Sequence, residues 1–158
     1  MATRLRRRVW CLILVLAVLS AAAQPPQPPE KLLDVSARLT DPDAQGRQEL
    51  KLTLKIKDGW HLYANPAGVE DYVPTTLAIQ AQPVPRELKI TYPEGKAMED
   101  PAGNGTLRVY EGEVTLRATW LRPGAAKGAE VEVSLRYQAC DAATCLPPKT
   151  LKLKVRGR

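Results

Sequence analysis

The sequence of 158 residues has few of the sulfur-containing and imidazole side chains that bind zinc or copper and activate nucleophiles. It contains three cysteines, two methionines and one histidine, His61, and it has no Cys-x2-Cys pair. A closed zinc site needs four protein ligands at characteristic spacings, and these are missing. A Ser-His-Asp site is also disfavoured, because no serine lies in a nucleophile-elbow motif. We therefore expect no cofactor, although a soft Cu(I) site of Cys140, Cys145 and Met98 is chemically feasible.

The sequence also lacks an apolar run long enough to span a membrane. Its apolar segment at residues 9–19 is shorter than the roughly 20 residues that a spanning helix needs. Four arginines precede the segment, and small residues up to Ala23 follow it. This pattern predicts a secretory signal peptide over residues 1–23, with a membrane anchor as the alternative. We expect a bacterial protein that is periplasmic or secreted and has no stable membrane insertion after cleavage.

The positive charge of the chain gives no reason to expect nucleic-acid binding. The formal net charge is +6, but the predicted signal peptide holds four of the 23 lysines and arginines and none of the 17 acidic residues. The rest of the chain is therefore nearly neutral. Its first part, residues 24–31, is a proline-rich linker.

The remaining residues, 32–158, alternate apolar and polar side chains in short segments. The clearest is at residues 50–56, where leucine or isoleucine alternates with lysine or threonine, as expected for a strand with one wet face. Hairpins are expected across Asp58-Gly59 and across residues 111–113. With no helical period, this pattern predicts an all-β antiparallel β-sandwich domain over residues 32–158. The expected strands lie near residues 32–39, 50–56, 60–63, 76–80, 88–92, 107–110, 114–120, 131–137 and 151–156.

Cys140 and Cys145 flank a short segment, residues 141–144. An extended chain would hold their Cα atoms about 16 Å apart, whereas a disulfide needs them within about 7 Å, so bonding requires a turn. Asp141 and Thr144 can support such a turn through hydrogen bonds to the local backbone. Cys11 should leave with the signal peptide. For a loop of about six residues a disulfide contributes roughly 2 kcal/mol, so the pair is a weak brace, and both a structural and an exchange role stay open.

Two motifs resemble one known family. They are residues 56–63, Ile-Lys-Asp-Gly-Trp-His-Leu-Tyr, and residues 137–148, which begin Tyr-Gln-Ala-Cys and end Cys-Leu-Pro-Pro. Together with Glu99-Asp100 and the segment at residues 110–116, they make residues 32–156 similar to the N-terminal periplasmic domain of the DsbD family of thiol:disulfide interchange proteins. The resemblance implies an immunoglobulin-like fold.

The resemblance also implies roles for individual residues. Cys140 and Cys145 would be the catalytic pair, with Cys145 attacked first and Cys140 resolving the mixed disulfide. His61, Tyr63 and Tyr137 would form the supporting wall of the site.

The acidic pair Glu99 and Asp100 would open a protective cap loop. In the family this loop carries a shielding aromatic residue, but residues 101–105 contain none here, and the chain has no phenylalanine at all. The cysteine spacing is one residue shorter than in the best-known members.

The partners implied are thioredoxin-like proteins or a DsbD-type membrane reductase that acts in trans on a stand-alone domain. The expected function is therefore electron relay through one redox-active cysteine pair. The alternative is a non-catalytic exported binding or scaffolding β-sandwich with a purely structural disulfide.

Overall fold

The computed structural model describes residues 32–158, which form eleven β-strands and, within that range, no helix. None of the described residues therefore forms a helix that could cross a membrane. The predicted signal peptide and proline-rich linker lie outside the described residues. The strands are β1 (Leu33–Leu39), β2 (Arg47–Ile56), β3 (His61–Tyr63), β4 (Thr76–Gln80), β5 (Arg86–Thr91), β6 (Lys96–Glu99), β7 (Thr106–Tyr110), β8 (Glu113–Leu121), β9 (Glu130–Tyr137), β10 (Ala139–Cys140) and β11 (Lys149–Arg156).

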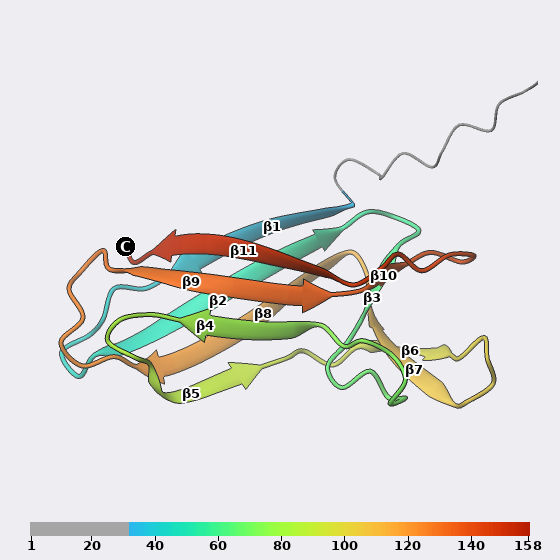
Figure 1. Cartoon of the computed structure of the whole chain (residues 1–158), viewed down its shortest axis with the longest axis horizontal. Helices are drawn as coiled ribbons and strands as arrows, with labels where there is room; N and C mark the ends of the chain where they lie inside the picture. Colours follow the sequence, from blue (N-terminus) through green and yellow to red (C-terminus); the bar gives the residue numbers. More distant parts are fainter. Residues whose placement is uncertain (1–31) are drawn as a thin grey trace, which may run out of the picture.

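The strands form three antiparallel sheets. A four-stranded sheet in the order β1-β2-β8-β5 packs against a three-stranded sheet in the order β11-β9-β4, and the two make the body of the sandwich (Figure 1). A second four-stranded sheet, β10-β3-β7-β6, lies at one end of this body. The prediction of an all-β antiparallel sandwich is confirmed.

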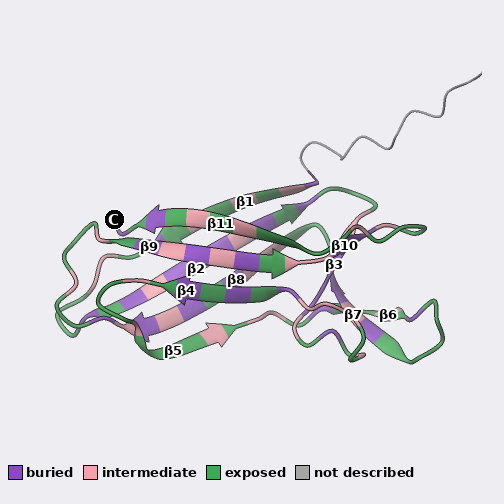
Figure 2. Cartoon of the chain, in the orientation of Figure 1, coloured by how far each residue is buried: buried purple, intermediate pink, exposed green. Residues whose placement is uncertain are grey.

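Apolar alternation places the core between the two sheets of the body. Along β2, every second residue from Gln48 to Ile56 is buried, and the polar residues between them, Glu49, Lys51, Thr53 and Lys55, face outward (Figure 2). Leu52 is 0% exposed and belongs to the same cluster as Val133 of β9 on the facing sheet. Because successive side chains point to opposite faces of a strand, a slip of one residue in the pairing of β2 would turn its buried leucines to solvent. The alternation therefore specifies the pairing register.

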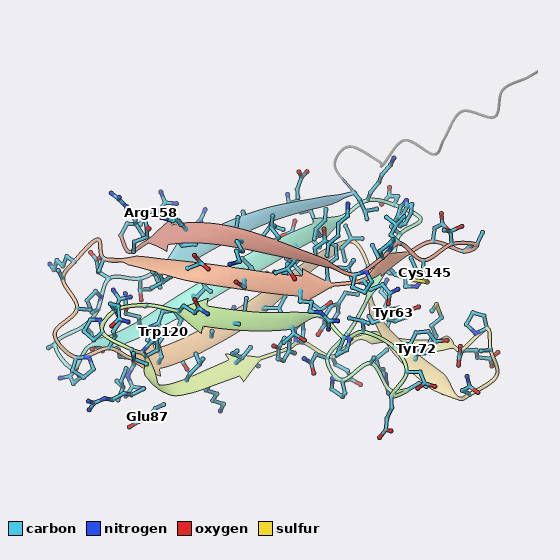
Figure 3. The ribbon with its side chains drawn as sticks, viewed as in Figure 1. Tyr63, Tyr72, Glu87, Trp120, Cys145 and Arg158 are labelled. Carbon is cyan, nitrogen blue, oxygen red and sulfur yellow. A yellow bond between two sulfur atoms is a disulfide. The ribbon has the colours of Figure 1, made fainter. Side chains whose placement is uncertain are left out.

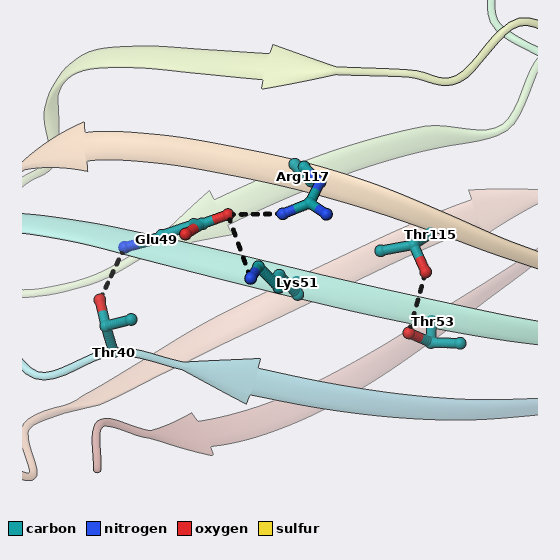
Figure 4. Close-up of polar contacts among 6 residues, drawn as sticks. All are labelled: Thr40, Glu49, Lys51, Thr53, Thr115 and Arg117. Atoms are coloured by element: carbon teal, nitrogen blue, oxygen red, sulfur yellow. Dashed lines mark hydrogen bonds and ion pairs between the residues drawn. The ribbon is translucent and has the colours of Figure 1, made fainter.

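The outer face of the same sheet shows that register directly. Thr53 of β2 lies opposite Thr115 of β8, and their hydroxyls are 3.1 Å apart (Figure 4). Further along the strands, Glu49 forms ion pairs with Arg117 at 2.9 Å and Lys51 at 3.9 Å. Such exposed pairs each contribute only about 0–1 kcal/mol, so they support the register more than the stability.

Both predicted hairpins are wrong, although both turns are present. Gly59 and Gly112 have φ values of +79° and +63°, which only glycine adopts easily. However, β2 pairs with β1 and β8, whereas β3 pairs with β10 and β7. The backbone N–H of Ile56 donates to the carbonyl of Gly112 at 2.8 Å, which ties the two turns together. At the first turn the chain therefore passes from β2 of the sandwich body to β3 of the sheet at its end, and at the second turn it returns from β7 of that sheet to β8 of the body.

Candidate functional site

Cys140 and Cys145 are joined by a disulfide at the end of the molecule where β10 lies. Their Cα atoms are 4.0 Å apart, so the chain folds back as the spacing argument required. The carboxylate of Asp141 accepts the backbone N–H groups of Ala143 and Thr144 at 2.8 and 2.7 Å. These two hydrogen bonds are the main reason why the pKa of Asp141 is lowered. The predicted turn is thus held by Asp141.

The two sulfurs of the disulfide belong to differently exposed residues. Cys140 is 1% exposed and lies in a small cluster with Tyr63, Leu107 and Val109, whereas Cys145 is exposed. Thiol-disulfide exchange requires a thiolate to reach one sulfur, and the other sulfur leaves. The arrangement therefore offers one accessible cysteine and one sheltered cysteine.

Tyr63 contacts both sulfurs. Its hydroxyl lies 3.2 Å from Cys140 Sγ and 3.4 Å from Cys145 Sγ, and Figure 3 shows it beside Cys145. Because disulfide sulfurs carry no hydrogen, the tyrosine O–H is the donor. Burial, and secondarily the charge of Asp100, raises the pKa of Tyr63, so the hydroxyl keeps its proton at neutral pH. The site thus has a fixed hydrogen-bond donor aimed at the disulfide.

His61 lies next to Cys140 in the strand ladder. The two residues are direct partners between β3 and β10, and the imidazole packs edge-on to Tyr63 with ring centroids 5.8 Å apart. Burial lowers the pKa of His61, although Glu111 and Asp141 act in the opposite direction. The imidazole is therefore neutral at pH 7. It also lines a groove of about 490 Å³ beside the site, together with Met98.

The two residues of the acidic pair, Glu99 and Asp100, differ in exposure: Asp100 is buried near the site, and Glu99 faces solvent. Asp100 is 5% exposed and accepts hydrogen bonds from the backbone of Ala102 at 3.0 Å and of Asn104 at 3.2 Å, as well as from the hydroxyl of Tyr72. The Tyr72 contact is the largest reason why the pKa of Asp100 is lowered, so its carboxylate is charged. Glu99, at the end of β6, is exposed.

Tyr137, the third predicted wall residue, packs against a different hydrophobic cluster from the one that contains Tyr63. It is half-buried near the end of β9, opposite Lys149 of β11, and it packs against the main core. Burial raises the pKa of Tyr137. Whereas His61 and Tyr63 contact one another beside the disulfide, Tyr137 belongs to the hydrophobic cluster of the sandwich body rather than to the cluster around Cys140.

Sequence reasoning missed Tyr72. It comes from the loop at residues 64–75, and its ring packs on Tyr63 with centroids 4.7 Å apart and planes at 53°. Its hydrogen bond to Asp100, together with burial and nearby negative charge, raises the pKa of Tyr72 to about 12. The cap loop itself has no aromatic residue, but this neighbouring loop supplies one. An isolated aromatic residue in a long segment without alternation was the only sequence signal.

Residues 32–158 contain no group of three or more histidine, cysteine or acidic side chains placed to hold a metal ion. The chemistry available in this part of the chain is that of the disulfide, with a tyrosine donor, a neutral imidazole and a charged carboxylate around it. These groups suit thiol-disulfide exchange, in which a sulfur must leave as a thiolate.

Comparison with known proteins decides the family. The family described as thiol:disulfide interchange protein DsbD, N-terminal, matches residues 23–156. The chain belongs to this family. No curated protein sequence shows significant similarity to this DsbD N-terminal domain.

Solved structures show the shared fold. The N-terminal periplasmic domain of ScsB from Proteus mirabilis matches with a TM-score of 0.64 and 17% identity, over 82% of this chain and 48% of that one. The chain thus spans about half the length of the ScsB structure. The DsbD N-terminal domain of Neisseria meningitidis in its reduced form matches with a TM-score of 0.50 and 20% identity, over 84% and 90% of the two chains.

A further match is the complex between the DsbD N-terminal and PilB N-terminal domains of Neisseria meningitidis. It has a TM-score of 0.54 and 20% identity, over 86% of this chain and 91% of that one. At these identities the comparisons concern the fold alone, and they confirm the immunoglobulin-like arrangement that the sequence resemblance implied.

Proposed function

We propose that this DsbD N-terminal domain is an exported thiol-disulfide exchange module, a cofactor-free thiol:disulfide oxidoreductase that relays electrons through Cys140 and Cys145. The observation that carries the proposal is the disulfide itself, with its exposed Cys145, its sheltered Cys140 and the Tyr63 hydroxyl within 3.4 Å of both sulfurs. A purely structural brace across so short a loop would contribute only about 2 kcal/mol.

Reduction of the domain takes two exchange steps. A thiolate of the donor protein attacks Cys145 Sγ, the Cys140–Cys145 bond breaks, and Cys140 leaves as a thiolate. The second donor thiolate then attacks the donor's own sulfur in the mixed disulfide and releases Cys145 as a thiolate. The donor ends as a disulfide, and the domain has gained two electrons and, after protonation, two protons.

Donation to the next protein runs in the reverse order. The Cys145 thiolate attacks the acceptor's disulfide and forms a mixed disulfide, which the Cys140 thiolate resolves. Throughout, the Tyr63 hydroxyl can donate a hydrogen bond to the negative charge that develops on Cys140, from which it lies 3.2 Å away. Hydrogen bonds to ionised groups are about twice as strong as neutral ones.

The partners proposed are thioredoxin-like proteins or a DsbD-type membrane reductase acting in trans. The family match supports this choice, and a DsbD N-terminal domain of Neisseria meningitidis has been solved in complex with a domain of another protein, PilB. The proposed site of action is the periplasm or the extracellular space, which follows from the predicted signal peptide and from an oxidising compartment for the disulfide.

Trapping the mixed disulfide tests the proposal. In Cys140→Ser the resolving sulfur is absent, so Cys145 should form a stable adduct with a thioredoxin-like protein, detected by non-reducing electrophoresis and mass spectrometry. Cys145→Ser is the matched control and should give at least about tenfold less adduct, because Cys140 is buried. If neither variant forms an adduct, the disulfide is structural and the domain is a binding or scaffolding sandwich.

A further inference from the structure

The loop at residues 64–75 is fastened to the site at both of its ends. At its end, the backbone N–H and hydroxyl of Thr75 both donate to the carbonyl of Tyr63, at 2.9 and 2.7 Å. At its start, Ala64 donates to the carbonyl of Arg108 of β7 at 2.8 Å, and Arg108 donates to Ala67 at 2.7 Å. The loop is therefore a closed structure that begins and ends at Tyr63.

The middle of the loop also has little freedom. Gly68 has a φ of +91°, and a Cβ at this position would clash with the carbonyl of Thr106. Only glycine permits this approach of the loop to β7. Through these contacts, the loop holds Tyr72 against the small cluster that contains Tyr63 and Cys140.

Tyr72 joins two parts of the site that are otherwise separate. Its ring packs against the ring of Tyr63, whose hydroxyl reaches both sulfurs. Its own hydroxyl donates to Asp100. Asp100 in turn closes the turn at residues 100–105, because its backbone N–H donates to Gly105 at 2.9 Å and its carbonyl accepts from Gly103 at 2.8 Å. A continuous series of contacts thus runs from the cap turn to the disulfide.

We propose that Tyr72 is a positioning residue for disulfide exchange: anchored by Asp100, its ring holds the Tyr63 hydroxyl against the Cys140 and Cys145 sulfurs. This inference rests on the proposed function. Tyr72 does not touch the reacting atoms in this account and acts through Tyr63. Cys145 is exposed while Tyr72 is in place, so Tyr72 does not cover the disulfide as a lid would. The geometry favours a role in supporting the Tyr63 hydroxyl.

The test is the second-order rate constant for reduction of the native disulfide by dithiothreitol, followed by alkylation and mass spectrometry. A dithiothreitol thiolate attacks Cys145, and Cys140 leaves as a thiolate. The second dithiothreitol sulfur then attacks the first, which breaks the mixed disulfide, releases Cys145 as a thiolate and closes the oxidised ring. Tyr63→Phe should slow this reaction about tenfold, because the leaving thiolate loses a hydrogen-bond donor. Tyr72→Ala should slow it severalfold, and Tyr72→Phe, which keeps the ring, should fall between Tyr72→Ala and the unmodified protein.

The matched control is Tyr92→Phe, which also removes one hydroxyl. Tyr92 accepts the backbone N–H of Leu77 at 2.9 Å and packs against the main core. Its loss should leave the rate constant unchanged. Denaturant unfolding of every variant establishes that the rates are those of folded protein.

Epistasis separates positioning from a merely structural effect. If Tyr72 acts through the Tyr63 hydroxyl, Tyr72→Ala should have no further effect in a Tyr63→Phe background. The inference would be overturned if Tyr72→Ala slowed the reduction just as much in the Tyr63→Phe background as alone. It would also be overturned if Tyr72→Ala left the rate constant unchanged, or raised it, as expected for removal of a lid. Because dithiothreitol replaces the protein partner, these outcomes are independent of the mixed-disulfide test of the proposed function.

Discussion

The two ends of the sandwich bury polar side chains in opposite ways. At the disulfide end, Tyr63, Tyr72 and Asp100 are linked by hydrogen bonds and ring packing. At the other end, where Figure 3 labels Trp120, the indole Nε1 of Trp120 and two guanidinium nitrogens of Arg122 have no hydrogen-bond partner among the described residues. Arg122 is 0% exposed, and within residues 32–158 its side chain makes one hydrogen bond, to the carbonyl of Glu130, which is long at 3.5 Å.

This difference indicates that buried polar side chains are fixed in position at the disulfide end and are not fixed by polar partners at the far end. A buried polar network fixes positions when its members are satisfied, and it costs stability when they are not. The disulfide end therefore has defined side-chain positions, as a reaction site needs. At the far end, burial without good partners lowers the pKa of Arg122. This end must be stabilised by the apolar core between the sheets instead.

The largest expected effect is on the free energy of unfolding, when a side chain is truncated in the apolar core that underlies both ends. Leu52→Ala should lower the free energy of unfolding by about 3 kcal/mol, because Leu52 is fully buried between the sheets and a cavity would remain. Chemical denaturation measures this loss. Below the transition, the rate of disulfide reduction by dithiothreitol should be unchanged. A large fall in that rate would show that the disulfide end is not independent of the body.

Removal of the disulfide is expected to have the next largest effect. Replacing both Cys140 and Cys145 by alanine should lower the free energy of unfolding by about 2 kcal/mol, since the closed loop is short. Denaturant unfolding of the double variant and of the oxidised parent gives the difference. A loss near 5 kcal/mol would mean that the disulfide end depends on the bond as a brace, contrary to the comparison drawn here.

At the far end, Arg122→Met should increase stability. Methionine has a similar volume and removes a buried charge with unpaired nitrogens, so the free energy of unfolding should rise by about 1 kcal/mol. Thermal or denaturant unfolding tests this. Destabilisation by a similar amount would show that Arg122 is satisfied in solution and that the two ends do not differ as described.

The smallest expected effect is a pH dependence of the stability that comes from His61 at the disulfide end. The pKa of His61 is lowered by burial from its ordinary value of 6.5, so the unfolded chain takes up a proton before the folded chain does. Stability should therefore fall slightly as the pH falls below about 6.5. In His61→Gln, unfolding between pH 7 and 5 should lose this component. An unchanged slope would assign the dependence to other groups.

Much of the sandwich body was predictable from the sequence. Residues 50–56 of β2 alternate so strictly between apolar and polar side chains that burial follows directly from the period. The pairing of β3 and β7 was not predictable, because Asp58-Gly59 and Glu111-Gly112 specify a change of direction but not the sheet that receives the next strand. β6 was missed for another reason: its residues are mostly exposed at a sheet edge, so they show no alternation.

The disulfide was the predictable part of the site. A disulfide between Cys140 and Cys145 required a turn, because an extended chain would hold them too far apart, and Asp141 was a recognisable turn residue. Tyr72 was not predictable, because its contact with Asp100 joins two loops that are 28 residues apart. The packing of Tyr137 against the main core depends on how β9 folds, and its role in the wall of the site stays a prediction.

The reduction potential of the native pair shows whether Cys140 and Cys145 can exchange electrons with other proteins. Equilibration with defined ratios of reduced and oxidised glutathione, followed by alkylation and mass spectrometry, gives this potential without denaturant. We expect a value less negative than about −300 mV, so that thiol proteins can reduce and reoxidise the pair. A value well below about −300 mV would identify a structural disulfide and contradict the proposed exchange role.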